Sequence, residues 1–133
     1  MKVNWWTRRG VWAVATYALC ACGIGSAQTT ATPLVRIAEL EIEPAHLAAY
    51  RAALSEEIES SIRLEPGVLA LYAVSLKDNP AQVRIFETYA DRNAYESHLK
   101  TPHFLRYKTS TQHMVKSLRL VETDAIRLGA KPI

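Results

Sequence analysis

The sequence predicts an α+β domain with the ferredoxin-like split βαβ arrangement, and three observations support this prediction. Apolar and polar residues alternate in four segments, with the period of a half-buried strand. Apolar residues at helical spacing fill the segment between the first two of these strands, and two shorter helical segments precede the fourth. The resulting order, β-α-β-β-α-(α)-β, belongs to a fold in which an antiparallel sheet carries its helices on one face.

The first half of the domain is predicted to be a strand, a long helix and a second strand. In the strand 34–43, apolar side chains point to one face and acidic ones to the other: Ala38, Leu40 and Ile42 against Glu39, Glu41 and Glu43.

Pro44 begins the helix, because proline suits a first helical position, and the helix runs to about Leu64. Its apolar stripe, which we assign to the core, is Leu47, Tyr50, Leu54, Ile58 and Ile62. Pro66-Gly67 ends the helix, and the strand 68–77 follows.

A carboxylate stands out on the third predicted strand. A hairpin through residues 78–81 leads to the strand 82–89, in which Glu87 shares a face with Val83, Ile85 and Tyr89. Burying a carboxylate on such a face is costly unless another group pairs with it. Glu87 is therefore either functional or paired with Arg84 or Arg106.

Two short helices and a last strand complete the domain. Asp91 caps the first helix, which carries His98 four residues after Ala94 on the same face. Thr101-Pro102 opens the second, with His103 and Phe104 in its first turn. The strand 116–123 follows, with Leu118 and Leu120 on one face. The sheet then has one face without helices, which a homodimer packed face to face would cover.

Residues 1–27 have the pattern of a secretory signal peptide. Lys2, Arg8 and Arg9 precede an apolar run that ends at small residues and is too short for a good membrane span. The pair Arg8-Arg9 also fits a twin-arginine export signal. Leu19-Cys20-Ala21-Cys22 resembles a lipobox, and only lipidation of Cys22 would then attach the protein to a membrane. We expect a periplasmic or secreted protein with three further segments: a linker at 28–33, the domain at 34–125 and a tail at 126–133.

The composition of the expected mature chain excludes several functions. Removing residues 1–27 takes away both cysteines and three basic residues, which leaves 13 basic and 13 acidic residues. Without a basic excess, nucleic-acid binding is not expected. Without cysteine, thiol catalysis and cysteine metal sites are excluded from the mature domain. About a hundred residues make one small domain, which oligomerisation would help to stabilise.

The candidate site joins Glu87 to the two helices that follow it. His98 is the candidate base, because an imidazole near neutral pH can accept a phenolic proton, and Glu87 would support it. Tyr72, Tyr89 and Phe104 would line a pocket for a flat ring, although Phe104 also fits plain core. His103 is a further candidate for substrate binding, with helix capping or solvent exposure as the favoured alternative.

Residues 34 to about 125 resemble the antibiotic biosynthesis monooxygenase (ABM) domain, in particular its quinol monooxygenase branch. The matching features are Glu43-Pro44, Glu65-Pro66-Gly67 and the spaced motif Glu87-x-Tyr89-x-Asp91-x-x-Ala94-x-x-x-His98-x-x-x-x-His103-Phe104. The resemblance implies a homodimer in which two sheets form a dimeric α+β barrel. It also implies oxidation of phenolic or quinol-type aromatics by molecular oxygen without metal, flavin or other cofactor. The haem-degrading relatives are a poorer match, because Lys108 falls at the position of the iron ligand.

Two other functions remain open at this point. The same base could enolise a small carbonyl compound, as in an isomerase or lyase, or the domain could bind a hydrophobic metabolite without catalysis. A metal site is not expected, since His98 and His103 are five residues apart and do not align on one helix. His46 and His113 show no clustering and are assigned to the surface.

Overall fold

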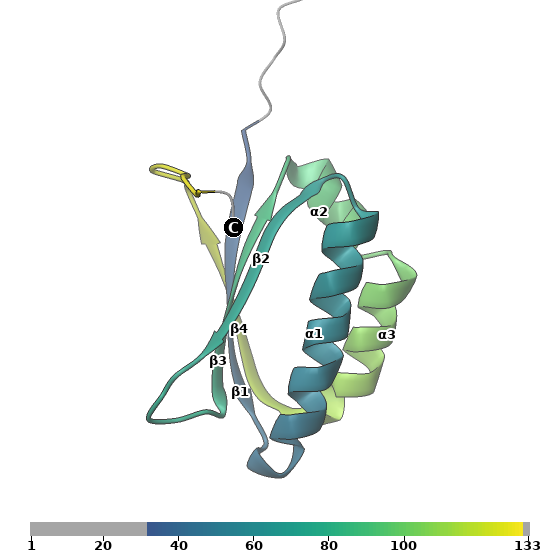
Figure 1. Cartoon of the computed structure of the whole chain (residues 1–133), viewed down its shortest axis with the longest axis vertical. Coiled ribbons are helices and arrows are strands. Elements are labelled where there is room, and N and C mark those ends of the chain that lie inside the picture. The colour runs from purple at the N-terminus through teal and green to yellow at the C-terminus, as the bar shows by residue number, and fades with distance from the viewer. Residues whose placement is uncertain (1–31, 132–133) are drawn as a thin grey trace, which may run out of the picture.

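The computed structural model describes residues 32–131, which form a four-stranded antiparallel sheet with helices on one face (Figure 1). The strand order is β2-β3-β1-β4. The elements are β1 (Leu34–Ile42), α1 (Leu47–Leu64), β2 (Val68–Ser75), β3 (Gln82–Tyr89), α2 (Arg92–His98), α3 (Pro102–Thr111) and β4 (Val115–Thr123), with 3₁₀ turns at Pro44–His46 and Gln112–Met114. This is the predicted α+β ferredoxin-like fold. The predicted signal peptide lies outside the described residues.

The strand register puts the predicted apolar face of the sheet under the helices. Leu40 pairs with Val83 on one side and Leu118 on the other, and Ala38 pairs with Ile85 and Leu120. Residues directly opposite each other in an antiparallel pair lie on the same face. Ala38, Leu40, Val83 and Ile85 join Ile42, Tyr50 and Leu54 in the main core. The predicted division of the first strand into an apolar and an acidic face is therefore confirmed.

The buried face of α1 changes character along the helix. Tyr50 and Leu54 are buried as predicted, but Ile62 is 49% exposed, so its assignment to the core is wrong. Glu57 and Ser61 are buried instead. They follow Tyr50 by seven and eleven residues and therefore belong to the same face of an α-helix. The C-terminal half of α1 consequently presents polar groups to the interior.

Local signals position α2 and α3 as predicted. The Asp91 side chain accepts a hydrogen bond from the Ala94 amide at 2.8 Å, and the Thr101 side chain accepts one from the Phe104 amide at 3.3 Å. Such caps satisfy amides that a helix leaves without partners at its N-terminus. At Gly67 the chain passes so close to α2 that an added Cβ would lie 2.6 Å from the Ala94 Cβ. Glycine at this position therefore lets α2 pack against the start of β2.

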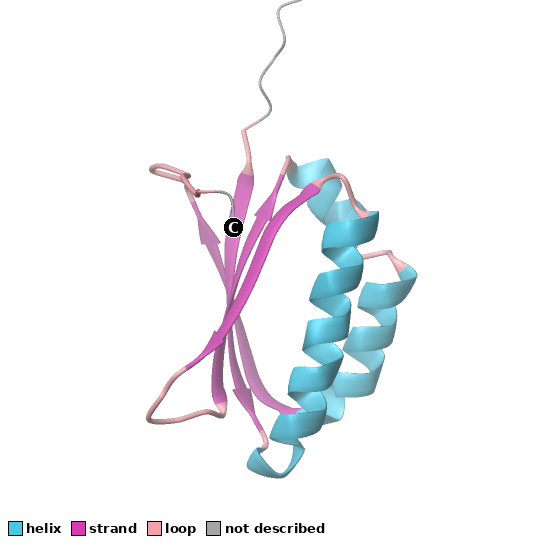
Figure 2. Cartoon of the chain, viewed as in Figure 1, coloured by secondary structure: helices cyan, strands magenta, loops and turns pink. Residues whose placement is uncertain are grey.

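Within residues 32–131, no helix covers the opposite face of the sheet (Figure 2). A row of apolar residues crosses its four strands, since Tyr72 pairs with Phe86, Phe86 with Ile37 and Ile37 with Val121. Tyr72 is 52% and Phe86 is 43% exposed. We call this row the open-face row. It is flanked by charged pairs, among them Arg119–Glu39 at 3.1 Å.

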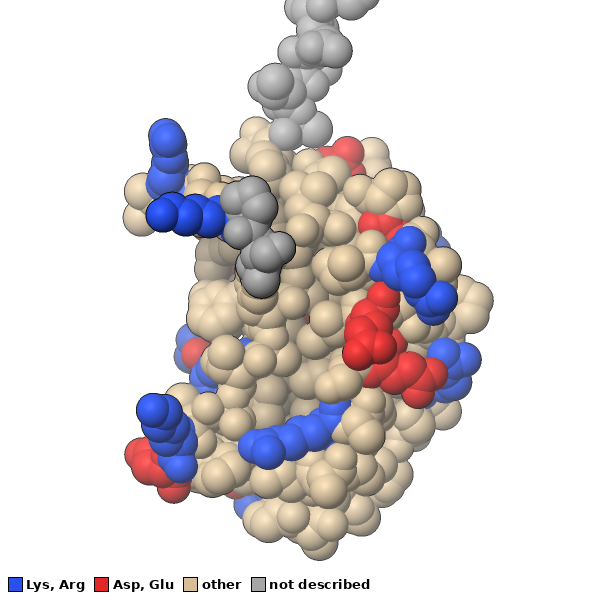
Figure 3. Space-filling view, viewed as in Figure 1, with Lys and Arg blue, Asp and Glu red and all other residues tan. Residues whose placement is uncertain are grey.

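Basic and acidic side chains alternate on the face of the molecule shown in Figure 3 and do not gather into a large patch of one sign. Among residues 32–131, no helix has the length and apolar character needed to cross a membrane.

Candidate active site

A pocket of about 490 Å³ lies between the sheet and the α2–α3 segment. Its walls are mainly apolar and aromatic, and they include Ala38, Leu40, Ile85, Glu87, Tyr89, Tyr95, His98, Leu99, Phe104, Tyr107, Leu118 and Leu120. Ligand pockets of this size typically combine apolar walls with a few polar groups that orient the ligand. The structure thus brings together four of the six predicted site residues: Glu87, Tyr89, His98 and Phe104.

Glu87 is the carboxylate that faces this pocket. Its Oε2 accepts a hydrogen bond from the Tyr89 hydroxyl at 3.3 Å, and no other donor contacts Glu87 among residues 32–131. Burial raises the pKa of Glu87, and this effect outweighs the Tyr89 hydrogen bond and the attraction of His98 and Arg36. Neither Arg84 nor Arg106 pairs with it; they contact Glu39 and Glu56. Glu87 therefore combines access to the pocket with raised basicity.

His98 contributes its ring to the same pocket, but its nitrogens face two other carboxylates. Nδ1 lies 3.0 Å from Glu65 Oε1, and Nε2 lies 3.7 Å from Glu57 Oε1. The ring is 3% exposed and packs against the rings of Tyr89 and Phe104, with centroids 5.4 and 4.7 Å away. The predicted partnership of His98 with Glu87 is therefore replaced by contacts with Glu57 and Glu65.

His103 is neither exposed nor a helix cap, so the favoured alternative for this residue is wrong. It is 8% exposed, and its Nε2 lies 2.6 Å from Glu65 Oε1. Burial opposes ionisation of Glu65, but hydrogen bonds from His98 and His103 outweigh it and lower the pKa of this carboxyl group. Glu57 in turn accepts a hydrogen bond from Ser61 at 2.7 Å. We call Glu57, Glu65, His98 and His103 the helix cluster.

The helix cluster has metal-ligating capacity that the spacing of its histidines conceals. Glu57, His98 and His103 each offer one ligand atom, and these atoms lie within 4.8 Å of one another. The expectation that no metal site forms rested on placing the two histidines on a single helix. In the structure His98 lies on α2 and His103 on α3, so that reason does not apply. The other two histidines are also neighbours, since the His46 and His113 rings are 5.3 Å apart, although no clustering was expected.

Tyr107 lines the pocket but does not offer a free hydroxyl. Its oxygen lies 2.7 Å from that of Tyr50. Burial raises the pKa of Tyr50 to about 12 and also raises the pKa of Tyr107. Both phenols stay protonated at neutral pH, so Glu87 is the better proton acceptor in this pocket.

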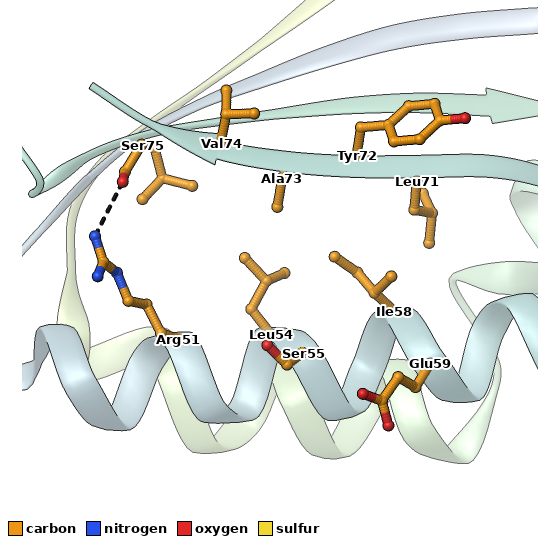
Figure 4. Close-up of a pocket in the computed structure, with 11 residues that line it drawn as sticks. Arg51, Leu54, Ser55, Ile58, Glu59, Leu71, Tyr72, Ala73, Val74 and Ser75 are labelled. Atoms are coloured by element: carbon orange, nitrogen blue, oxygen red, sulfur yellow. Dashed lines mark hydrogen bonds between the residues drawn. The ribbon is translucent and has the colours of Figure 1, made fainter. Parts of the chain in front are cut away.

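Tyr72 lies on the other side of the sheet and does not line this pocket, contrary to the sequence prediction. Figure 4 shows Leu71 and Ala73 pointing from β2 toward α1, whereas Tyr72 points away from the helix. A groove of about 540 Å³ lies between β2 and α1, with Arg51, Leu54 and Ile58 among its lining residues (Figure 4). The Arg51 guanidinium donates a hydrogen bond to Ser75 Oγ at 2.9 Å. Among the groove's lining residues there is no histidine, and its one acidic group is Glu59.

Sequence reasoning missed three charged residues near the site. Glu57 could have been recognised from the sequence, because it falls on the buried face of α1. Glu65 is the C-cap of that helix. It belongs to the Glu65-Pro66-Gly67 motif, which was interpreted from the sequence only as the connection between the helix and the second strand. Arg36 is 7% exposed, lies opposite Glu87 in the sheet, and places its guanidinium 4.5 Å from the centre of the Tyr95 ring. Arg36 could also have been recognised from the sequence, because an arginine on an otherwise apolar strand face is unusual.

The sequence profile of the antibiotic biosynthesis monooxygenase (ABM) family matches residues 33–110. A candidate antibiotic biosynthesis monooxygenase from Bacteroides thetaiotaomicron is 48% identical, with a TM-score of 0.73 over 77% of this chain and 97% of the other. A candidate monooxygenase from Lactobacillus acidophilus is 31% identical, with a TM-score of 0.65 over 68% of this chain and 45% of the other. A protein from Nitrosomonas europaea, 22% identical with a TM-score of 0.68 over 72% of this chain and 92% of the other, shares the fold. No curated protein matches the chain.

Proposed function

Because this chain belongs to the antibiotic biosynthesis monooxygenase family, we propose that it oxidises a small phenolic or quinol-type aromatic with molecular oxygen, without a cofactor. The observation that carries this proposal is the pocket of about 490 Å³, whose mainly apolar and aromatic walls surround the partly buried carboxylate Glu87. An electron-rich ring with one ionisable hydroxyl group matches this lining. Tyr89, Phe104 and the His98 ring would contact its faces and edges.

In the proposed reaction, Glu87 takes the hydroxyl proton of the substrate. The resulting anion passes one electron to oxygen, and the two radicals combine at a ring carbon. Glu87 returns its proton to the peroxide anion so formed. Loss of water then leaves one oxygen atom on the product and the other in water, so that the substrate supplies all the electrons. The protein excludes bulk water and holds the ring near the carboxylate.

The roles of Glu87 and His98 in this proposal follow from their neighbours. The raised pKa of Glu87 brings its basicity closer to that of a phenol, which favours proton transfer. Both nitrogens of His98 face carboxylates of the helix cluster. The imidazole ring therefore completes the wall of the pocket and orients the aromatic ring of the substrate. His98 is thus a positioning residue, and Glu87 is the proton acceptor.

Oxygen consumption by the purified domain tests the proposal, with a panel of quinols, phenols and small diketones as substrates. We expect turnover of a phenol or quinol without added flavin or metal, and a loss of roughly 10²–10⁴-fold in the variant Glu87→Gln. Isomerisation of a carbonyl compound without oxygen uptake would support the isomerase or lyase instead. Binding without any turnover would support a binding domain. A rate that depends on added flavin or iron would refute cofactor independence.

The assembly and location of the protein are parts of the same proposal. The open-face row gives a second copy an apolar surface to cover, and pairing two such sheets would close a dimeric barrel. Export of the domain would follow from the basic, apolar and small-residue pattern of residues 1–27. Mass spectrometry of the exported protein should find an N-terminus near Gln28 or a lipidated Cys22, and an intact Met1 on a cytosolic form would contradict export.

A further inference from the structure

We propose that the helix cluster is a binding site for one divalent transition-metal ion, with Glu57, His98 and His103 as ligands and Glu65 as their outer partner. This inference does not depend on the reaction in the pocket. It starts from three ligand atoms within 4.8 Å of one another, supplied by three different helices. Imidazole and carboxylate together suit Zn²⁺, Fe²⁺ and Mn²⁺ in proteins.

The hydrogen bonds within the cluster leave one nitrogen of each imidazole available. His98 uses Nδ1 toward Glu65, and His103 uses Nε2 toward the same carboxylate oxygen. Metal-binding histidines commonly donate their second nitrogen to a carboxylate in this way, which fixes the ring and raises its basicity. Glu65 therefore orients both rings as an outer carboxylate does around a bound metal.

The remaining contact inside the cluster is not a hydrogen bond. His98 Nε2 lies 3.7 Å from Glu57 Oε1, which is too far for a hydrogen bond. When Nδ1 of His98 carries the proton, the two facing atoms are both electron-pair donors. One divalent ion placed among the Glu57, His98 and His103 ligand atoms would give all three a common partner.

A second cavity, which shares only Tyr107 with the lining of the substrate pocket, offers an entry route. This cavity, of about 190 Å³, is lined by Glu57 and His103, together with Ala53, Glu56, Arg106, Tyr107 and Ser110. Neither Glu57 nor His103 lines the substrate pocket. An ion entering here would join α1, α2 and α3 and would be separated from the substrate by the His98 ring. The site thus has a structural role.

Metal content and thermal melting of the metal-free protein test this site, with Zn²⁺ and Mn²⁺ as probes. We expect one equivalent of Zn²⁺ per chain after dialysis. A concentration one hundred times Kd should raise Tm by roughly 10–20 °C. Glu57→Gln and His103→Gln should abolish both effects. The control is the double variant His46→Ala/His113→Ala, which removes the only other histidine pair among residues 32–131 and should bind as the wild type does.

A spectroscopic measurement covers the case in which the cluster variants fail to fold. Co²⁺ added to the wild type should give visible absorption bands typical of bound nitrogen and oxygen ligands, and Zn²⁺ should displace them. Absence of stoichiometric metal and of a Tm shift in the wild type would overturn the site. Binding lost only in the His46/His113 variant would also overturn it. If Fe²⁺ binds and accelerates oxidation, the site stands but the cofactor-independent reaction falls.

Discussion

Replacing Glu87 with glutamine should stabilise the protein at neutral pH, although it removes the proposed proton acceptor. Glutamine keeps the shape of the side chain and can still accept the Tyr89 hydrogen bond. The wild-type carboxyl group has a raised pKa because burial disfavours its charged form. Above the ordinary carboxyl pKa, ionisation therefore favours the unfolded chain, and the stability of the wild type falls as pH rises through the folded-state pKa.

The expected gain follows from the surroundings of Glu87. An uncompensated buried polar group costs about 1–3 kcal/mol in mutational data. Here Tyr89 donates a hydrogen bond, and His98 and Arg36 attract the charge, so the lower end of that range applies. A gain of about 1 kcal/mol corresponds to a rise in Tm of roughly 4–8 °C for a domain of this size.

Urea or thermal unfolding of wild type and Glu87→Gln between pH 3 and 8 measures this difference. The advantage of the variant should be full near pH 8 and should vanish below the ordinary carboxyl value of 4.5. Glu96→Gln on the exposed side of α2 is the matched control and should show no comparable trend. A variant less stable than the wild type at pH 7, or a difference independent of pH, would mean that Glu87 is a well-compensated charge, and the reasoning would be refuted.

Three further predictions follow from the same structure. His98→Ala should lower turnover less than Glu87→Gln does, because His98 positions the pocket wall; a larger loss in His98→Ala would make the imidazole the base. Gly67→Ala should destabilise the fold by about 1–3 kcal/mol because the new Cβ overlaps α2, whereas Gly129→Ala, with nothing within 4 Å, should melt as the wild type does. Light scattering should show a wild-type dimer and a Phe86→Lys monomer, since a lysine in the open-face row would be buried without a partner; a monomeric wild type would contradict the barrel.

Local patterns in the sequence were sufficient for the fold. Strand alternation placed Ala38 and Leu40 on the buried face, because the side-chain period of a strand is fixed by its geometry. Asp91 and Thr101 marked the starts of two helices through capping bonds that span only three residues. Such signals act between near neighbours and can be recognised in a single sequence.

The helix cluster shows where this reasoning ends. Glu65 contacts His98 and His103, which are 33 and 38 positions away. No periodicity relates residues at such separations, since their contact depends on how α1 packs against α2 and α3. The prediction therefore identified both histidines but paired His98 with Glu87, the carboxylate that strand alternation had placed on the apolar face. Ile62 failed for a related reason, because the polar cluster takes the place of apolar core at that end of α1.

His98 lies between Glu87 in the pocket and the carboxylates of the helix cluster, and it influences both. An imidazole in contact with Glu87 would favour its ionised form and lower its pKa, which would make it a weaker base. His98 does attract the Glu87 charge, but burial outweighs this attraction, and the nitrogens of His98 contact Glu57 and Glu65 instead of Glu87. The His98 ring then offers the pocket a flat wall while its polar atoms stay in the helix cluster. The polar groups at the end of α1 therefore engage His98, while burial in the apolar pocket keeps the pKa of Glu87 raised.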